Sequence, residues 1–248
     1  MINDSHIHVG QFYETYTSPQ DLSLLMKRLE VDGYAVSSTT VCEKNFSKVL
    51  QEIQKLIDID GDRVVPILWL SPEIFLDELL RDTFLNCGIH WKALKIHPDW
   101  QPYVWSDVSN QRNLLDLADR IDVPILIHTG GHEYSACSIW EEVIRNHPEQ
   151  KFILAHCRPF DKAISIIEKY DNTYGDLAFV DSADFIKLHN SRSCDRILWG
   201  SDFPIVSHYI NTDLRDYYEQ RLIELKVAVG DSRFEQITQD NFNDLFYR

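Results

Sequence analysis

The sequence predicts an α/β protein, a (β/α)8 barrel, on three observations. Short runs rich in Val, Ile, Leu and Thr recur eight times, with helix-like stretches between them. Most of these runs are near-continuously apolar, as parallel strands are when both of their faces are covered. The 248 residues are also close to the about 250 that such a barrel needs. No stretch of Pro, Gly or Ser is long enough to act as a linker, so we expect one barrel domain over residues 1–248.

The pattern assigns a range to each element. The expected strands are residues 2–8, 33–41, 63–70, 92–97, 122–129, 151–156, 173–180 and 195–201. The expected helices are residues 21–30, 45–58, 73–86, 109–120, 138–146, 162–170, 183–189 and 213–228, with a closing helix from Phe234 to Arg248. Ser18-Pro19, Ser71-Pro72 and Asp161 stand where helix starts favour a cap or a first-turn proline. A doubly wound open sheet is the structural alternative, but it gives no reason for polar residues at so many strand ends.

The composition limits the partners. Acidic residues number 39 against 24 lysines and arginines, a formal charge of −15, which repels a polyanion over most of the surface. We therefore expect a small-molecule substrate, and neither nucleic acid nor an anionic membrane. The five cysteines are scattered without a C-x-x-C pair, which is typical of reduced thiols in the cytoplasm. The first residues lack an export signal, and no apolar run reaches the length of a membrane span, so a cytoplasmic protein is expected.

The first expected strand ends in a pair of histidines, in the run Asp-Ser-His6-Ile-His8. Alternate side chains of a strand share one face and lie about 7 Å apart, so His6 and His8 can converge on one ion where the strand end twists. The alternative is two polar residues that simply end a strand. An H-x-H pair alone does not decide between them.

Five other polar residues share one position, at or next to the carboxyl end of an expected strand, and these are Lys95, His97, His128, His156 and Asp202. Taken singly, each has an ordinary explanation: a hydrogen-bonded histidine, a turn aspartate, or a buried lysine paired with a carboxylate. Taken together, they fall where barrels assemble their sites. Imidazoles with a carboxylate suit Zn²⁺, or another ion such as Fe²⁺ or Mn²⁺.

These residues and their contexts resemble a known family. The order of H-x-H on strand one, His on strands five and six, and Asp on strand eight is similar to that of the amidohydrolase superfamily. More narrowly, Asp-Ser-His-Ile-His, Lys-Ile-His-Pro, His-Thr-Gly, Gly-Ser-Asp-Phe-Pro and Asn-Phe-Asn-Asp-Leu-Phe resemble its amidohydrolase-2 branch. The similarity runs from residue 4 to residue 246.

The resemblance implies a metal site and roles for its residues. The implied ligands are His6, His8, His128 and Asp202. Two versions of the site exist in the superfamily. With one ion, which we favour, His156 faces the substrate or the hydrolytic water; with two, it binds the second ion, bridged by a carboxylated lysine at Lys95. Zinc is the expected ion, and Asp202 and His156 are the expected catalytic residues.

The expected reaction is hydrolysis of a small amide, lactone or ester by a metal-activated water, with Asp202 as the general base. The first alternative is a metal-dependent, non-oxidative decarboxylase of a small aromatic or unsaturated acid, because the branch includes such enzymes. The second alternative is a barrel that binds without catalysing.

The substrate-binding candidates lie on the loops. The longest expected loop runs from residue 98 to 108 and carries Trp100 and Tyr103, which can form an aromatic wall; the alternative is an anchor packed on the barrel rim. His97 precedes this loop, and Arg158 can hold a substrate carboxylate by a bidentate contact, unless it is a solvated loop arginine. The remaining loops are short, so the pocket is open or is completed by a neighbouring subunit of a homo-oligomer.

Overall fold

The computed structural model describes residues 1–100, 102–130 and 132–247. The chain forms two compact units, which are described separately below. Unit 1 contains Met1–Pro66 and Leu177–Arg248, and unit 2 contains Ile67–Asp176. Strand β4 (Val64–Trp69) begins in the first and ends in the second. In both units strands alternate with helices, as the sequence predicts.

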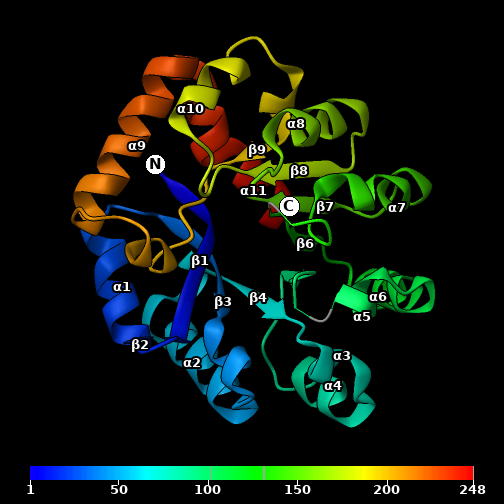
Figure 1. The fold of residues 1–248 in the computed structure, drawn as a ribbon. Helices are drawn as coiled ribbons and strands as arrows, with labels where there is room; N and C mark the ends of the chain where they lie inside the picture. The colour runs from blue at the N-terminus through cyan, green and yellow to red at the C-terminus, as the bar shows by residue number, and fades with distance from the viewer. Residues whose placement is uncertain (101, 131, 248) are drawn as a thin grey trace. The chain divides into compact units, whose positions relative to one another are not determined.

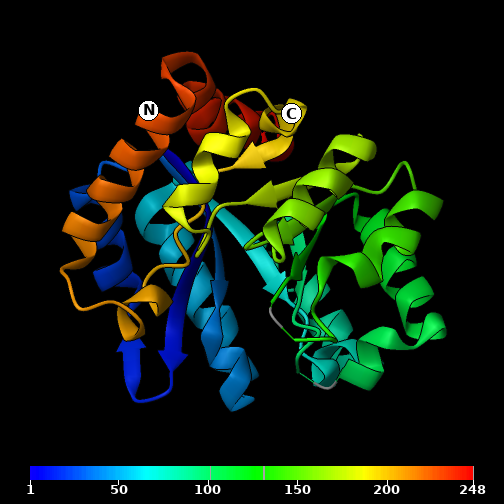
Figure 2. The same cartoon turned by 45° about the horizontal axis from the view of Figure 1, so that its top comes forward.

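Unit 1 is built on a parallel sheet in which β1 (Asn3–Phe12) pairs with β3 (Gly33–Ser38), and β3 with the start of β4. Beyond its expected end at His8, β1 continues and turns back as an antiparallel hairpin with β2 (Thr15–Thr17), the blue pair of arrows in Figure 2. This hairpin is not predicted by the sequence pattern, because its turn carries no Asn-Gly or similar signal.

The last strand of the chain lies parallel to the first. Strand β9 (Ile197–Leu198) leads into a segment whose backbone bonds to β1. The N–H of Asp202 donates to the carbonyl of His6 at 2.8 Å, and the N–H of His8 donates to that of Phe203 at 2.6 Å. Within unit 1, these bonds join the segment that follows the last strand to the first strand.

Helices α1 (Pro19–Arg28) and α2 (Phe46–Asp60) lie beside β1 and β3 (Figure 1). Ser18 caps α1 as predicted, accepting from the N–H of Asp21. The other α-helices of unit 1 are α9 (Leu214–Val229), α10 (Asp231–Glu235) and α11 (Asn241–Phe246). Shorter 3₁₀ segments are η1 (Thr39–Glu43), η2 (Gly61–Arg63), η4 (Ser182–Leu188), η5 (Arg192–Arg196) and η6 (Ile205–His208). The expected closing helix is α10 and α11 joined by a π-helical turn, η7 (Gln236–Asp240).

Unit 2 contains the end of β4 followed by β5 (Ala93–Ile96), β6 (Ile125–His128), β7 (Phe152–Ala155) and β8 (Thr173–Asp176). Each strand pairs in parallel with the next along the chain. Nearly all residues of β5 to β7 are buried, which explains their almost uninterrupted apolar sequence.

The helices of unit 2 are α3 (Pro72–Leu76), α4 (Glu78–Leu85), α5 (Pro102–Ser106), α6 (Val108–Ile121), α7 (Glu141–Asn146) and α8 (Phe160–Lys169), with the 3₁₀ segment η3 (Cys137–Trp140). Helices α6 to α8 lie along one side of β6 to β8 (Figure 1). The expected helix 73–86 is interrupted at Asp77, whose extended backbone lets its carboxylate cap α4. The expected loop 98–108 contains α5, and Asp161 lies in the first turn of α8 rather than before it.

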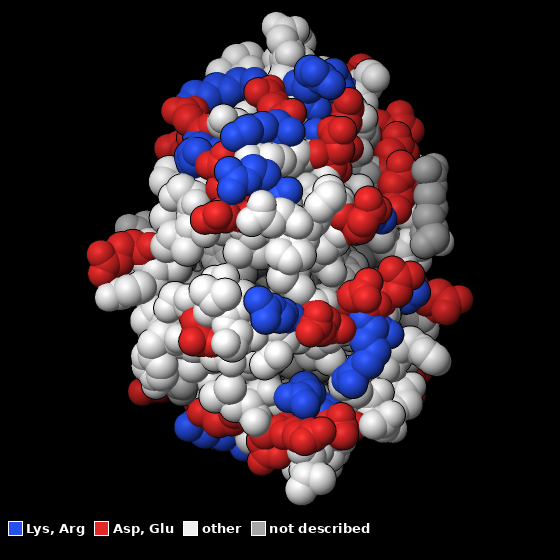
Figure 3. All heavy atoms as spheres, turned by 90° about the vertical axis from the view of Figure 1, so that its right-hand side faces the viewer, with Lys and Arg blue, Asp and Glu red and all other residues white. Residues whose placement is uncertain are grey.

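Some charged side chains of unit 2 form ion pairs with one another. Glu141 pairs with Lys162 at 2.6 Å and with Lys169 at 3.0 Å, and these hydrogen bonds lower the pKa of Glu141 to about 2. On the face drawn in Figure 3, cationic and acidic side chains are intermingled. Among the residues described, no helix has the length and apolar character needed to cross a bilayer.

Candidate functional site

Unit 1 brings three of the predicted ligands together. The Nε2 atom of His8 lies 2.9 Å from Oδ1 of Asp202, and Nε2 of His6 lies 3.4 Å from the same oxygen. All three are at most 5% exposed. We call these residues the unit 1 cluster. Its strands bring them together, because β1 carries the two histidines and the segment after β9, bonded to β1, carries the aspartate.

Backbone contacts fix the orientation of this cluster. The Nδ1 atom of His8 lies 3.3 Å from the carbonyl oxygen of Ser37 and 3.1 Å from its hydroxyl, so the ring presents Nε2 to Asp202. Asp202 itself has a left-handed backbone, with φ of 58°, which costs a non-glycine residue about 1–2 kcal/mol. Strained positions of this kind concentrate at functional sites.

The unit 1 cluster fits a divalent ion by its donors and their spacing. Two imidazole nitrogens and a carboxylate oxygen are the ligands that zinc prefers. Ligand atoms bound at 2.0–2.1 Å in a tetrahedron are about 3.3 Å apart, and the two separations here, 2.9 and 3.4 Å, are close to that value. A histidine–aspartate ion pair explains one of these contacts, but not the convergence of two imidazoles on one oxygen.

A fourth polar residue of unit 1, Asp4, lies beneath this cluster. It is fully buried, and its Oδ1 accepts from the N–H groups of His6 and Ser201, each at 3.1 Å. Its Oδ2 has no hydrogen-bond partner among the described residues. Burial raises the pKa of Asp4 to about 7, although the hydrogen bonds from Ser201 and His6 oppose that shift.

Unit 2 brings together two more of the predicted residues, His128 and His156, which we call the unit 2 cluster. Nδ1 of His128 lies 3.1 Å from Nε2 of His156. The N–H of His156 donates to the buried carboxylate of Asp176 at 2.9 Å, and its φ of 69° is again left-handed. Two imidazole nitrogens this close share either a proton or a metal ion.

Rings line the end of β5 in the same unit. His97 stacks on His128, with centroids 3.7 Å apart, and on Trp100 at 5.2 Å. Trp69, at the end of β4, stacks on both His97 and Trp100. Lys95 is 2% exposed, and its ammonium lies 4.4 Å from the centroid of Trp69, a cation–π geometry.

The other two predicted residues are less enclosed. Arg158 is partly buried, and its N–H donates to the hydroxyl of Thr129 at 2.7 Å. Tyr103 lies on α5 with 70% of its surface exposed. The predicted ligands and catalytic residues are divided between the two units, and the structure brings together only those of one unit. The complete set therefore stays a prediction.

Four residues that contact the predicted site residues were not predicted from the sequence, and these are Ser37, Trp69, Asp99 and Asp176. Ser37, Trp69 and Asp176 lie at or near the carboxyl end of a strand, and Asp99 follows β5 closely. That position was the available signal. Their residue types are common near strand ends in any protein, so position alone does not mark them as part of a site.

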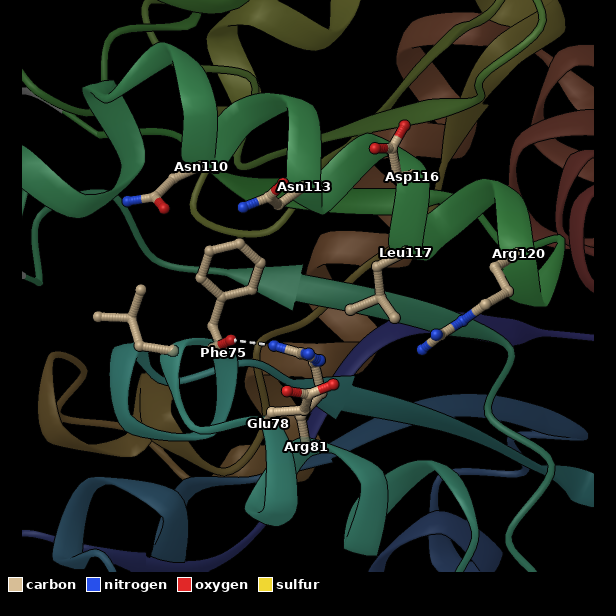
Figure 4. Close-up of a pocket in the computed structure, with 9 residues that line it drawn as sticks. Phe75, Glu78, Arg81, Asn110, Asn113, Asp116, Leu117 and Arg120 are labelled. Carbon is tan, nitrogen blue, oxygen red and sulfur yellow. Dashed lines mark hydrogen bonds between the residues drawn. The ribbon is translucent and has the colours of Figure 1, made fainter.

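A separate pocket of about 400 Å³ lies between α3–α4 and α6 (Figure 4). It is lined by Phe75, Leu76, Glu78, Arg81, Asn110, Asn113, Asp116, Leu117 and Arg120. One guanidinium nitrogen of Arg81 already donates to the carbonyl of Phe75 at 2.7 Å. The lining includes two arginines and two carboxylates, and none of the predicted site residues lines it.

Solved structures with the same fold cover the whole chain. The 4-oxalomesaconate hydratase of Rhodopseudomonas palustris is 15% identical, with a TM-score of 0.71 over 100% of this chain and 96% of its own. An amidohydrolase of Burkholderia multivorans with bound zinc is 12% identical, with a TM-score of 0.70 over 100% and 99%. A 2,6-dihydroxybenzoate decarboxylase in complex with 2,6-dihydroxybenzoate is 13% identical, with a TM-score of 0.67 over 100% and 98%. These likenesses confirm the predicted (β/α)8-barrel fold class.

The family of this chain follows from its sequence. None of the curated proteins matches the chain. The profile of the family described as Amidohydrolase, in its amidohydrolase-2 form, matches residues 4–247, nearly the whole length. This chain therefore belongs to the amidohydrolase-2 family, the branch that its strand-end motifs resemble.

Proposed function

We propose that this protein is a cytoplasmic metal-dependent hydrolase of a small amide, lactone or ester. The main support for this proposal is the unit 1 cluster, in which two buried imidazoles converge on one oxygen of Asp202. Membership of the amidohydrolase-2 family supports an enzyme, and the zinc-bound amidohydrolase of the same fold supports zinc as its ion. The five cysteines are all free thiols, in keeping with a reducing compartment.

In this proposal His6, His8 and Asp202 hold the ion, and His128 completes the set. When bound, a divalent ion polarises a carbonyl and lowers the pKa of water to about 7. The carboxylate of Asp202 would take a proton from the attacking water and deliver it to the leaving group. His156 donates to the developing oxyanion of the substrate.

A small cavity beside His8 supports hydrolysis. It has a volume of about 10 Å³ and is lined in part by Thr39, Ile205 and His208. That is the space of about one water molecule. A water placed there would lie next to a proposed metal ligand.

One ion is the version we favour, and Lys95 supports it. A second ion requires this lysine in its carboxylated form, a carbamate, which is an anion. Its position over the Trp69 ring instead suits an ammonium, since a cation is what the face of the ring attracts.

Decarboxylation is the second candidate, because a 2,6-dihydroxybenzoate decarboxylase shares the fold and because the rings beside His97 suit a flat substrate. The two reactions differ in their products. Hydrolysis takes up water and releases no gas, whereas decarboxylation releases carbon dioxide.

The decisive experiment begins with the metal content of the purified full-length chain, measured before and after chelation and after adding Zn²⁺ or Mn²⁺. We expect about one ion per chain. The loaded protein is then assayed for carbon dioxide release and for hydrolysis over a panel of amides, lactones, esters and the acid 2,6-dihydroxybenzoate. Less than about 0.5 ion per chain, with no uptake on reconstitution, would sink the proposal and favour a non-catalytic binding protein.

A further inference from the structure

The loop after β5 brings a carboxylate to one of the proposed ligands. Oδ2 of Asp99 lies 3.7 Å from Nε2 of His128. The other ring nitrogen, Nδ1, faces His156 at 3.1 Å. The two nitrogens of one imidazole therefore have different neighbours, an anion on one side and a second imidazole on the other.

Asp99 is held in this place by its surroundings. The N–H of Trp100 donates to the carbonyl of His97 at 2.9 Å, which closes a tight turn around residues 97–100. Gly130 leaves room for the contact, because a Cβ atom there would lie 3.3 Å from both Oδ2 of Asp99 and Nε2 of His128. The same Cβ would meet the hydroxyl of Ser135 at 2.7 Å.

The carboxylate is also poorly solvated. Its side chain is 19% exposed, and Oδ1 is buried without a hydrogen-bond partner among the described residues. Such a group costs free energy, so its placement calls for an explanation. Its ion-pair partner is the ring of His128.

A metal site of its own is not that explanation. His97, Asp99 and His128 offer three ligand atoms close together. However, the two rings are stacked, 3.7 Å apart and only 14° from parallel. The lone pairs of an imidazole lie in the plane of its ring, so two rings stacked in this way do not aim at one ion between them.

We infer that Asp99 is a positioning residue, whose carboxylate holds His128 with its proton on Nε2 and leaves Nδ1 as the ligand nitrogen. This inference rests on the proposed function, in which His128 binds the ion. At 3.7 Å the contact is an electrostatic one rather than a hydrogen bond, and a carboxylate beside the second nitrogen of a ligating histidine favours the tautomer that turns an N–H toward it. His8 is held by a carbonyl oxygen in the same sense, but with the opposite nitrogen, Nδ1, on the supporting side.

The test measures the Zn²⁺ affinity of the full-length chain by competition with a chelator. Asp99→Asn should weaken binding about 10- to 100-fold, the range for outer-shell partners of a metal-bound histidine. Asp99→Glu should recover part of the loss. Asp116→Asn, an exposed aspartate on α6, is the matched control and should bind like the wild type. Equal affinity of Asp99→Asn and wild type would overturn the inference.

A spectroscopic readout separates positioning from a merely structural role. In ¹⁵N spectra of histidine-labelled, zinc-loaded protein, His128 should carry its proton on Nε2 and bind through Nδ1. Binding through Nε2 would refute the inference. If Asp99→Asn fails to fold, Gly130→Ala probes the same contact from the other side and should also lower the affinity.

The possible results distinguish a failure of this inference from a failure of the proposed function. A wild-type chain that takes up no Zn²⁺ refutes the proposed function. The tautomer of His128 in the metal-free protein then still decides the role of Asp99: protonation on Nε2 that disappears in Asp99→Asn supports it, and no difference between the two proteins refutes it.

Discussion

The two histidine clusters differ in burial and in the groups that orient them. In unit 1, His6 and His8 are at most 2% exposed, and they share a carboxylate that is itself a proposed ligand. In unit 2, the side chain of His128 is 17% exposed, and its carboxylate neighbour, Asp99, is 19% exposed. Backbone bonds between β1 and the chain after β9 hold the first cluster, whereas a turn and a ring stack hold the second.

The difference in burial suggests that one cluster suits metal binding and the other suits contact with substrate. A buried cluster fixed by strand pairing suits the tight binding of an ion, because its donors need no rearrangement. A more open cluster beside stacked rings suits contact with substrate, which must enter and leave. Substitutions in the unit 1 cluster should therefore mainly weaken metal binding. Substitutions in the unit 2 cluster should weaken metal binding less and substrate binding more.

The largest expected effect follows removal of a unit 1 ligand. His8→Ala and Asp202→Asn should each weaken Zn²⁺ binding by more than the about 100-fold that outer-shell changes reach. His128→Ala should keep an ion at saturating Zn²⁺, because three donors remain in unit 1. Bound metal is measured after gel filtration, with His90→Ala, an exposed histidine, as control. A greater loss in His128→Ala than in His8→Ala would reverse the comparison.

The next effect concerns Asp4, beneath the unit 1 cluster. Its folded pKa of about 7 lies above the ordinary value of 3.8. The folded state then binds the proton more tightly, so the stabilising contribution is full below pH 3.8 and is lost as the pH rises through 7. Metal-free wild type should lose about 2–3 kcal/mol more than Asp4→Asn between pH 5 and pH 8. Urea unfolding at several pH values measures this, and parallel curves would show that Asp4 keeps an ordinary pKa.

A smaller effect is expected at the ring stack of unit 2. Trp100→Ala removes a ring that stacks on His97 and Trp69. Binding of the flat acid 2,6-dihydroxybenzoate should weaken about 3- to 10-fold, as the loss of an aromatic pair does. Tyr103→Ala, 70% exposed, should change it less. Calorimetry on zinc-loaded protein measures both, and equal effects would mean that the stack is not the binding wall.

The smallest effect is expected at Ser37. Ser37→Ala removes one of two contacts to Nδ1 of His8, but the backbone carbonyl remains. Zinc affinity should fall about two- to threefold, at the low end of the value of one hydrogen bond. A loss as large as that expected for Asp99→Asn would show that the hydroxyl, rather than the carbonyl, orients His8.

The sequence predicted the strands better than the joints between elements. All eight expected strands are present. Buried parallel strands such as Ile125–His128 consist mostly of apolar residues, which makes them recognisable in the sequence. The helix 73–86 breaks at Asp77, and loop 98–108 contains a short helix. Both depend on local capping and packing, which periodicity does not record.

The site was predictable in part for a similar reason. His6, His8 and Asp202 stand at strand ends, and one rule about barrels placed them together. Asp99 and Ser37 were missed because their roles depend on which ring nitrogen they face. Which ring nitrogen a neighbour faces can be read only from the three-dimensional structure.

The pairing of β1 with the chain after β9 has a consequence for biosynthesis. Hydrogen-bonded residues in this pairing are 194 and 197 positions apart, as for Ser5 with Trp199 and Asp4 with Ser201. A nascent chain therefore holds His6 and His8 for most of translation without the aspartate they share. Contacts of such long range form late, so the polypeptide should acquire its ion only after the segment bearing Asp202 has left the ribosome.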